Sequence, residues 1–160
     1  MEDLKFINSE VVFQEIPDEI TLAINISGCP VHCTDCHSKF LWENTGTELN
    51  LFTLNNSIIS NPGITCVCFM GGDGREEAIR KLIFNIKQLY PKLKTGWYLG
   101  RKTLDINEDY KFIDYLKIGP YIKELGGLDS PTTNQKMYKF KPIGLSGFIL
   151  YKDITKKFQK

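Results

Sequence analysis

The chain has 160 residues, of which 42% are hydrophobic and 24% are charged, values typical of one globular domain. Its 20 Lys and Arg residues nearly balance 19 Asp and Glu residues. The resulting net charge of +1 excludes a broad electrostatic grip on nucleic acid or on an acidic membrane. No run of about 18 apolar residues could span a bilayer, and the charged N-terminus does not resemble a secretory signal. We therefore expect a cytoplasmic protein that binds neither nucleic acid nor membranes.

The first half of the chain alternates predicted strands with a predicted helix. Residues 19–26 alternate apolar and polar side chains, which predicts a strand. Residues 51–60 are expected to form a short helix that ends at an Asn-Pro-Gly sequence. Residues 64–70 form a short, almost wholly apolar run between two glycines, as in a buried central strand.

The same alternation continues in the second half. Apolar side chains recur at three- and four-residue steps over 75–90, which predicts an amphipathic helix. Residues 95–99 and 115–118 are predicted strands, with a short helix between them over 107–114 whose N-cap is Asn107.

Strands separated by helices indicate an α/β fold with a mostly parallel sheet of four or five strands. The length is well short of the roughly 250 residues of a complete eightfold barrel. We expect a single domain over residues 1–160, with a core at about 10–140 and a Lys-rich tail, solvated or helical, at about 152–160.

Three of the five cysteines, Cys29, Cys33 and Cys36, form a C-x3-C-x2-C sequence directly after the first predicted strand. Spacings this short allow one loop to place three thiolates around a single metal centre. Three protein thiolates would leave one iron of a [4Fe–4S] cluster open to another molecule, whereas structural zinc requires four ligands. The loop therefore favours one iron–sulfur cluster per chain.

Structural zinc is the alternative. His32 or His37 could complete a four-ligand site, and Cys66 and Cys68 could contribute to another. These two cysteines point to the same face of their predicted strand. A second cluster or redox pair is conceivable there, but buried cysteines that act as small hydrophobic residues are commoner.

The cysteine sequence and its position after a strand resemble those of the radical S-adenosylmethionine (AdoMet) enzymes. In that family the open iron binds the amino and carboxylate groups of AdoMet. Electron transfer from the cluster then cleaves AdoMet and produces a 5′-deoxyadenosyl radical. The resemblance implies an incomplete (β/α) barrel of the radical AdoMet type, with no catalytic residues beyond the cluster and AdoMet.

Gly71-Gly72-Asp73, at the end of the predicted strand 64–70, is similar to the Gly-Gly-Glu element with which the family binds the AdoMet amino group. Glycines permit close approach of the backbone to a ligand, and a carboxylate can bind an amine. A Gly-Gly-Asp sequence alone is more often a turn. Asp73 replaces the commoner Glu, and Gly74 occupies a position where Pro often follows.

Residues near the third cysteine are expected to contact AdoMet as well. Many radical AdoMet enzymes have an aromatic residue just before this cysteine, near the adenine, whereas this chain has Asp35. His37 could supply the ring instead. The resemblance thus assigns Asp35, Cys36 and His37 to the cofactor site, together with the Gly-Gly-Asp element.

Residues 114–129 and the following Thr132-Thr133-Asn134-Gln135 are similar to the C-terminal signature of activating proteins for anaerobic ribonucleotide reductase. The resemblance covers roughly residues 10 to 140. It implies that the chain places a radical on a glycine of the large reductase subunit, with reduced flavodoxin or a similar protein as electron donor. A radical AdoMet enzyme for a small molecule, and a non-enzymatic zinc or electron-transfer module, are the alternatives.

Within this signature, Lys117 and Tyr121 lie where a substrate peptide could pass, but structural roles are equally compatible with the sequence. Asn134 and Gln135 could bind the backbone of a docked loop or could cap a turn. At least one of Trp97 and Tyr98 should lie in the core, because neighbouring strand residues face opposite sides of a sheet.

Overall fold

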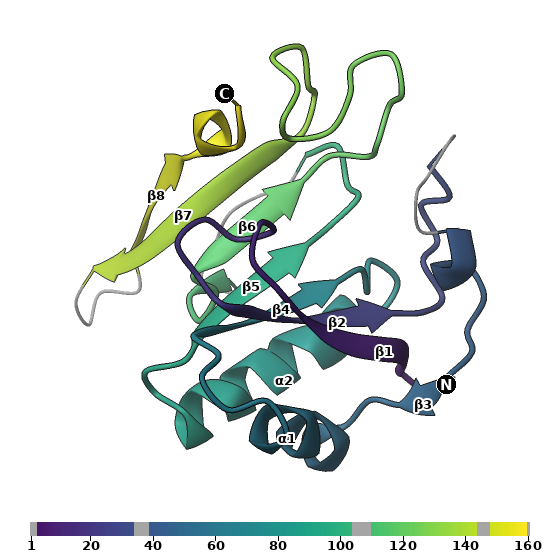
Figure 1. Ribbon diagram of the computed structural model, residues 1–160, viewed down its shortest axis with the longest axis vertical. Helices are drawn as coiled ribbons and strands as arrows, with labels where there is room; N and C mark the ends of the chain where they lie inside the picture. The colour runs from purple at the N-terminus through teal and green to yellow at the C-terminus, as the bar shows by residue number, and fades with distance from the viewer. Residues whose placement is uncertain (1–2, 34–38, 104–109, 144–147, 160) are drawn as a thin grey trace.

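The computed structural model describes residues 3–33, 39–103, 110–143 and 148–159. They form one mixed sheet of eight strands with two α-helices packed on the same face (Figure 1). The strands are β1 (Lys5–Val12), β2 (Thr21–Ile26), β3 (Thr47–Glu48), β4 (Cys66–Met70), β5 (Lys94–Tyr98), β6 (Tyr115–Ile118), β7 (Lys136–Ile143) and β8 (Phe148–Asp153). The helices are α1 (Leu51–Ile59) and α2 (Glu76–Leu89), with 3-10 turns η1 (Lys39–Leu41) and η4 (Thr155–Phe158).

The strand order is β3-β1-β2-β4-β5-β6-β7-β8. The central strands β2, β4, β5 and β6 are parallel to one another, whereas the flanking strands are antiparallel to their neighbours. The α/β class is therefore confirmed, but the sheet is mixed rather than mostly parallel. Among the described residues, β3 and β8 are the two edges of the sheet, and the partial barrel remains a prediction.

The four central strands and both α-helices confirm the elements predicted over 19–26, 51–60, 64–70, 75–90, 95–99 and 115–118, with ends displaced by at most two residues. The helix predicted over 107–114 lies partly outside the described residues. Its described part forms a turn in which the Ile113 N–H donates a hydrogen bond to the Tyr110 carbonyl (3.0 Å). No helix in the described part of the chain is long and apolar enough to cross a membrane.

The main core lies between the helices and the sheet. The stripe of α2 buries Ile79, Leu82, Ile83 and Ile86 against inward-facing strand residues, among which Trp97 is fully buried. This burial confirms that one member of the Trp-Tyr pair belongs to the core, and it removes a large apolar area from water.

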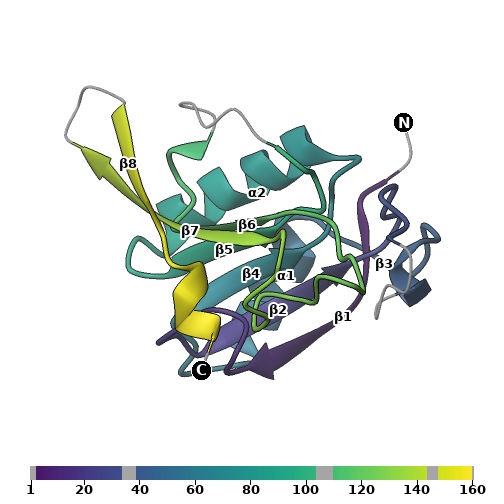
Figure 2. The same cartoon turned by 90° about the horizontal axis from the view of Figure 1, so that it is seen from above.

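A second, smaller core lies on the opposite face of the sheet, where Figure 2 shows η4 on the side away from α2. It contains the fully buried side chains of Ile16, Cys66, Cys68 and Met137. Both cysteines are free thiols, and burial raises their pKa values well above the usual value. Neutral, buried thiols of this kind fit the interpretation of Cys66 and Cys68 as small hydrophobic residues.

The described part of the C-terminal segment, for which a solvated or helical tail is expected, continues β8 and ends in the 3-10 turn η4, with part of it packed in the second core. β8 extends to Asp153, and the next residues, Ile154 and Thr155, are buried. Asp153 Oδ1 accepts hydrogen bonds from the backbone N–H (2.9 Å) and hydroxyl (2.5 Å) of Thr155. Ile154 packs in the second core and thereby attaches the C-terminal segment to the sheet, although its neighbours in sequence are mostly polar.

Candidate functional site

The parallel strands β2, β4, β5 and β6 all end on the same side of the sheet. Open α/β sheets bind ligands at these C-terminal strand ends. The segments that follow these strands line a cavity of about 160 Å³, called here the strand-end cavity. Its polar lining includes Cys29, Cys33, Asp73, the Gly100 backbone, Lys117 and Tyr121.

The cysteine loop is held over the strand ends by backbone contacts at its base. Gly28 adopts a positive φ of 74°, and the Cys29 N–H donates to the Leu41 carbonyl at 2.8 Å. His32 also has a positive φ, and its ring stacks on Trp42 with a centroid distance of 4.4 Å. His32 therefore shapes the loop.

Close packing of this loop on β5 requires a glycine. A Cβ atom at Gly100 would lie 2.8 Å from Val31 Cγ2, a distance that real Cβ atoms do not tolerate. Since Gly100 follows β5 by two residues, it lets the segment between Cys29 and Cys33 approach the end of the sheet.

Two of the three predicted cluster ligands, Cys29 and Cys33, are half-buried free thiols that line the strand-end cavity. Burial is the largest cause that raises the pKa of Cys29, and the negative charge of Asp73 acts in the same direction. Cys33 Sγ accepts a hydrogen bond from the Tyr121 backbone N–H (3.4 Å).

The third predicted ligand, Cys36, lies outside the described residues, as do Asp35 and His37. Within the part of the chain that the structure describes, no three His, Cys, Asp or Glu side chains are grouped to hold a metal ion. Cys36 therefore stays the predicted third ligand of the cluster.

Asp73 lies at the same cavity. Its Oδ2 accepts a hydrogen bond from the Gly100 N–H (2.9 Å), so that the ends of β4 and β5 are joined. Burial raises the pKa of Asp73, although the Gly100 hydrogen bond and the positive charge of Lys117 act in the opposite direction. The site thus holds a partly buried carboxylate whose charged form a further cationic partner would stabilise.

Among the described residues that line the cavity, Lys117 is the positively charged one. Its side chain is buried, Nζ donates to the Gly119 carbonyl (2.8 Å), and Nζ lies 5.7 Å from the centre of the Tyr98 ring. The strand-end cavity therefore carries a carboxylate and an ammonium group, a combination that matches a zwitterionic ligand.

The two glycines of the Gly-Gly-Asp element have different surroundings. Gly71 lines the cavity with a φ of 109°, and its carbonyl accepts a hydrogen bond from Trp97 Nε1 (2.7 Å). Gly72 is buried, with a φ of 88°, and a Cβ there would lie 2.9 Å from Ile79 Cγ1 of α2. The structure therefore brings Gly71 and Asp73 to the cavity, while Gly72 faces the helix.

The signature over residues 114–129 divides into a structural and a cavity-lining part. Asp114 Oδ2 accepts hydrogen bonds from the Thr95 N–H (2.8 Å) and Lys87 Nζ (2.5 Å), which ties β5 and α2 to the start of β6. Lys117 and Tyr121, farther along the same signature, reach the cavity.

Gly100 was not identified from the sequence as a site residue. For Gln135 the sequence left open whether the side chain binds a docked loop or caps a turn. Both line the cavity. Gly100 follows a predicted parallel strand directly, as Gly71 and Gly119 do, so the repeated glycine after a strand end is the signal that could have identified it.

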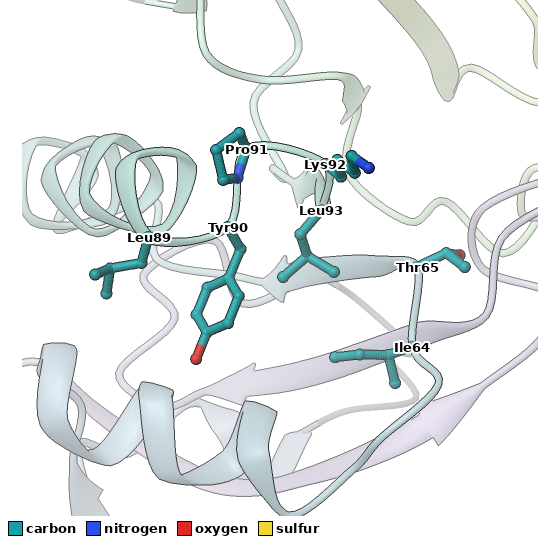
Figure 3. Close-up of a pocket in the computed structure, with 7 residues that line it drawn as sticks. All are labelled: Ile64, Thr65, Leu89, Tyr90, Pro91, Lys92 and Leu93. Carbon is teal, nitrogen blue, oxygen red and sulfur yellow. The ribbon is translucent and has the colours of Figure 1, made fainter.

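A different hollow, of about 580 Å³, lies at the other end of the parallel strands (Figure 3). It is lined mainly by apolar side chains where Ile64 and Thr65 lead into β4 and Leu93 leads into β5. Among the described residues that line it, the charged one is Lys92 and none is a cysteine. Its chemistry gives no reason to place a redox centre there.

The strand-end cavity falls within a segment that matches a known family. The family model of 4Fe-4S single cluster domains matches residues 20–136, that is 117 of the 160 residues. The chain belongs to this family. No curated protein and no solved structure matches the chain.

A 4Fe-4S single cluster domain of this kind is typical of radical AdoMet activases. The match covers the parallel strands, the cysteine loop, the Gly-Gly-Asp element and Lys117. Membership in the family favours an iron–sulfur cluster over structural zinc. The donor set fits such a cluster, since Cys29 and Cys33 place two thiols at one cavity and a backbone N–H already points at one sulfur.

Proposed function

We propose that the protein is a radical AdoMet activase that generates a glycyl radical on an anaerobic ribonucleotide reductase. The observation that carries this proposal is the meeting of Cys29, Cys33 and the Gly-Gly-Asp carboxylate at one cavity of a 4Fe-4S cluster domain. When bound, the cluster would supply the electron that cleaves AdoMet to methionine and a 5′-deoxyadenosyl radical, which takes a hydrogen atom from a glycine Cα. The incomplete (β/α) barrel of the radical AdoMet type is part of the same proposal.

Cys29, Cys33 and Cys36 would hold the cluster. The first two are anchored by the base of their loop and by the close packing of that loop on Gly100. Three ligands leave a coordination position for AdoMet, and the cavity between the strand ends extends from the two cysteines toward Asp73 and Lys117.

Asp73 and Lys117 would orient the methionine part of AdoMet. The carboxylate of Asp73 would bind the AdoMet ammonium group, because it is partly buried and a cationic partner would stabilise its charged form. Lys117 would face the AdoMet carboxylate. Gly71 supports this arrangement, since its backbone lines the cavity without a side chain. Asp35 and His37 remain the candidates for contacts near the adenine.

The assignment of the partner depends on the resemblance of residues 114–129 and 132–135 to the reductase activases. Two observations are compatible with it: Lys117 and Tyr121 of this signature line the cavity, and so does Gln135. A glycine loop that enters the site would therefore meet signature residues. Reduced flavodoxin is the proposed electron donor, and the domain needs neither nucleic acid nor a membrane.

The test is an anaerobic assay with purified, cluster-loaded protein, AdoMet, and either dithionite or reduced flavodoxin. We expect slow formation of 5′-deoxyadenosine by the protein alone. Addition of the reductase from the same cell should give a glycyl-radical doublet in the EPR spectrum. The matched control is a reductase whose radical-bearing glycine is replaced by Ala, which should give no doublet.

A result in which only a small metabolite stimulates deoxyadenosine formation would contradict the activase proposal and support the small-molecule alternative. Stoichiometric zinc without iron after anaerobic reconstitution would contradict both forms of radical chemistry and leave the zinc module.

A further inference from the structure

The peptide group between Pro120 and Tyr121 lies between the cysteine loop and the segment that leads into β7. Its N–H, from Tyr121, donates a hydrogen bond to Cys33 Sγ at 3.4 Å. Its carbonyl, from Pro120, accepts a hydrogen bond from Asn134 Nδ2 at 3.0 Å. A single peptide group thus connects the Asn134 side chain to a cysteine sulfur of the site.

The turn that carries this peptide is fixed from several sides. The Gly119 N–H donates to the Arg101 carbonyl (2.6 Å), and the Gly119 carbonyl accepts from Lys117 Nζ (2.8 Å) and Gln135 Nε2 (3.3 Å). Gly119 also has a φ of 106°, and a Cβ there would lie 3.0 Å from the Gln135 Cα. Because Gly119, the residue before Pro120, is held in this way, the Tyr121 N–H has a defined direction.

A backbone N–H that points at a ligand sulfur changes the energetics of an iron–sulfur cluster. The reduced cluster carries one more negative charge than the oxidised cluster, and a hydrogen bond to a thiolate stabilises the more negative state. The reduction potential therefore rises. A donor on the carbonyl side of the same peptide polarises the group and strengthens its N–H as a donor.

We propose that the Tyr121 N–H, oriented and polarised by Asn134, is a built-in control of the reduction potential of the cluster. Asn134 is then a positioning residue that acts on the metal centre through a peptide group. This inference rests on the proposed role of Cys33 as a cluster ligand. It does not depend on AdoMet cleavage or on the identity of the protein that receives the radical.

The first test compares Tyr121→Pro with Tyr121→Ala. Proline removes the N–H, whereas alanine removes the same aromatic ring and keeps the N–H. The preceding residue is itself a proline, and a residue before a proline must avoid the α-helical region of the backbone, which consecutive prolines commonly do. After iron and sulfide have been quantified, the midpoint potential is measured without AdoMet by redox titration of the EPR signal of the reduced cluster.

We expect a more negative midpoint potential for Tyr121→Pro than for Tyr121→Ala, since both variants lose the aromatic ring and only the proline variant loses the N–H. Asn134→Ala should shift the potential in the same direction by a smaller amount. Thr132→Ala is its control, because the Thr132 hydroxyl donates to the Leu125 carbonyl in the same loop and not to the turn. Equal potentials for the proline and alanine variants at position 121 would overturn the inference.

A second measurement uses the wild-type protein, in case the proline variant does not retain its cluster. Protein labelled with ¹⁵N-tyrosine should show a ¹⁵N coupling to the reduced cluster by pulsed EPR, together with a nearby deuteron after exchange into D₂O. Absence of both couplings would overturn the inference. Retention of the cluster by Cys33→Ala would instead refute the ligand assignment in the proposed function, so the two failures are distinguishable.

Discussion

The backbone N–H of Gly100 donates a hydrogen bond to Asp73 Oδ2 at 2.9 Å and thereby joins the ends of two parallel strands at the candidate site. This contact fixes the carboxylate at the cavity while burial raises its pKa. A carboxylate can accept about four hydrogen bonds, so this half-buried group has further capacity that a cationic ligand could use.

Asp73→Asn should weaken AdoMet binding and leave the cluster intact. The amide oxygen of Asn can still accept from the Gly100 N–H, so the variant removes the charge with little change of shape. Hydrogen bonds to charged groups contribute about 1.5–3 kcal/mol, which corresponds to a loss of affinity of roughly tenfold or more. Titration of the reduced cluster with AdoMet, followed by EPR, measures this loss. An unchanged affinity would mean that Gly-Gly-Asp is only a turn.

Lys117→Met should also weaken AdoMet binding, because it removes the ammonium group that we assign to the AdoMet carboxylate. Methionine retains most of the buried stem, and Gln135 Nε2 continues to donate to the Gly119 carbonyl. The same EPR titration applies. Lys123→Met, at an exposed position of the following loop, serves as the control and should leave the affinity unchanged.

Replacement of Cys29, Cys33 or Cys36 by Ala should abolish the cluster, whereas replacement of Cys66 or Cys68 should not. The last two are buried in the second core, and their neutral thiols lie away from the strand-end cavity. Iron and sulfide analysis of anaerobically reconstituted protein distinguishes the two groups. Retention of about four irons per chain by any of the first three variants would exclude that cysteine as a ligand.

Elements with a dense local signal could be predicted from the sequence, and elements that depend on distant partners could not. The apolar run of β4 predicts a buried strand, and the apolar stripe of α2 predicts an amphipathic helix. β1 contains no buried residue and β7 is rich in lysine, so neither has the pattern of a buried strand. η4 is held by Ile154 in a core made of residues far away in sequence.

The same division applies to the candidate site. Cys29, Cys33 and Asp73 belong to local motifs and could be proposed from the sequence, and the structure places them at one cavity. The different surroundings of Gly71 and Gly72 depend on how α2 packs, which no local motif encodes. The contact of the Tyr121 N–H with Cys33 joins residues 88 positions apart and is visible only in three dimensions.

Gly72→Ala should destabilise the whole fold, because its Cβ would both strain a left-handed backbone and collide with Ile79 Cγ1 at 2.9 Å. Gly63→Ala is a matched control, since Gly63 has a similar φ of 90° with no atom within 4 Å of its Cβ. The control should lose about 1 kcal/mol of unfolding free energy from backbone strain. Gly72→Ala should lose about 1–3 kcal/mol more from overpacking. Urea unfolding of the cluster-free proteins measures both, and equal losses would contradict the predicted collision.

Asp153→Asn should make the free energy of unfolding less dependent on pH in the acidic range. Burial of the Asp153 carboxyl acts to raise its pKa, but the hydrogen bonds from the Thr155 hydroxyl and backbone N–H, together with the charges of Lys136 and Lys156, outweigh this effect and lower the pKa. A carboxyl group whose pKa is lower in the folded state stabilises the protein above the pKa of the unfolded state, about 4 for Asp. This stabilisation is lost as the pH falls through the folded-state pKa. The wild-type protein should therefore exceed Asp153→Asn in stability near neutral pH, and the difference should disappear in acid.

Urea unfolding at a series of pH values between about 7 and 2 tests this expectation, because the range extends below the lowered folded-state pKa of Asp153. Glu10→Gln is the control for the loss of one negative charge, because Glu10 is an exposed residue on β1. Loss of the Asp153 charge should also loosen the 3-10 turn η4, because the carboxylate fixes Thr155. The Thr155 hydroxyl in turn accepts a hydrogen bond from the Met137 N–H (3.0 Å). Hydrogen exchange at Met137 should therefore accelerate in Asp153→Asn at neutral pH and not in Glu10→Gln. A stability difference that stays constant from neutral to acid would show that Asp153 acts through shape alone and not through its charge.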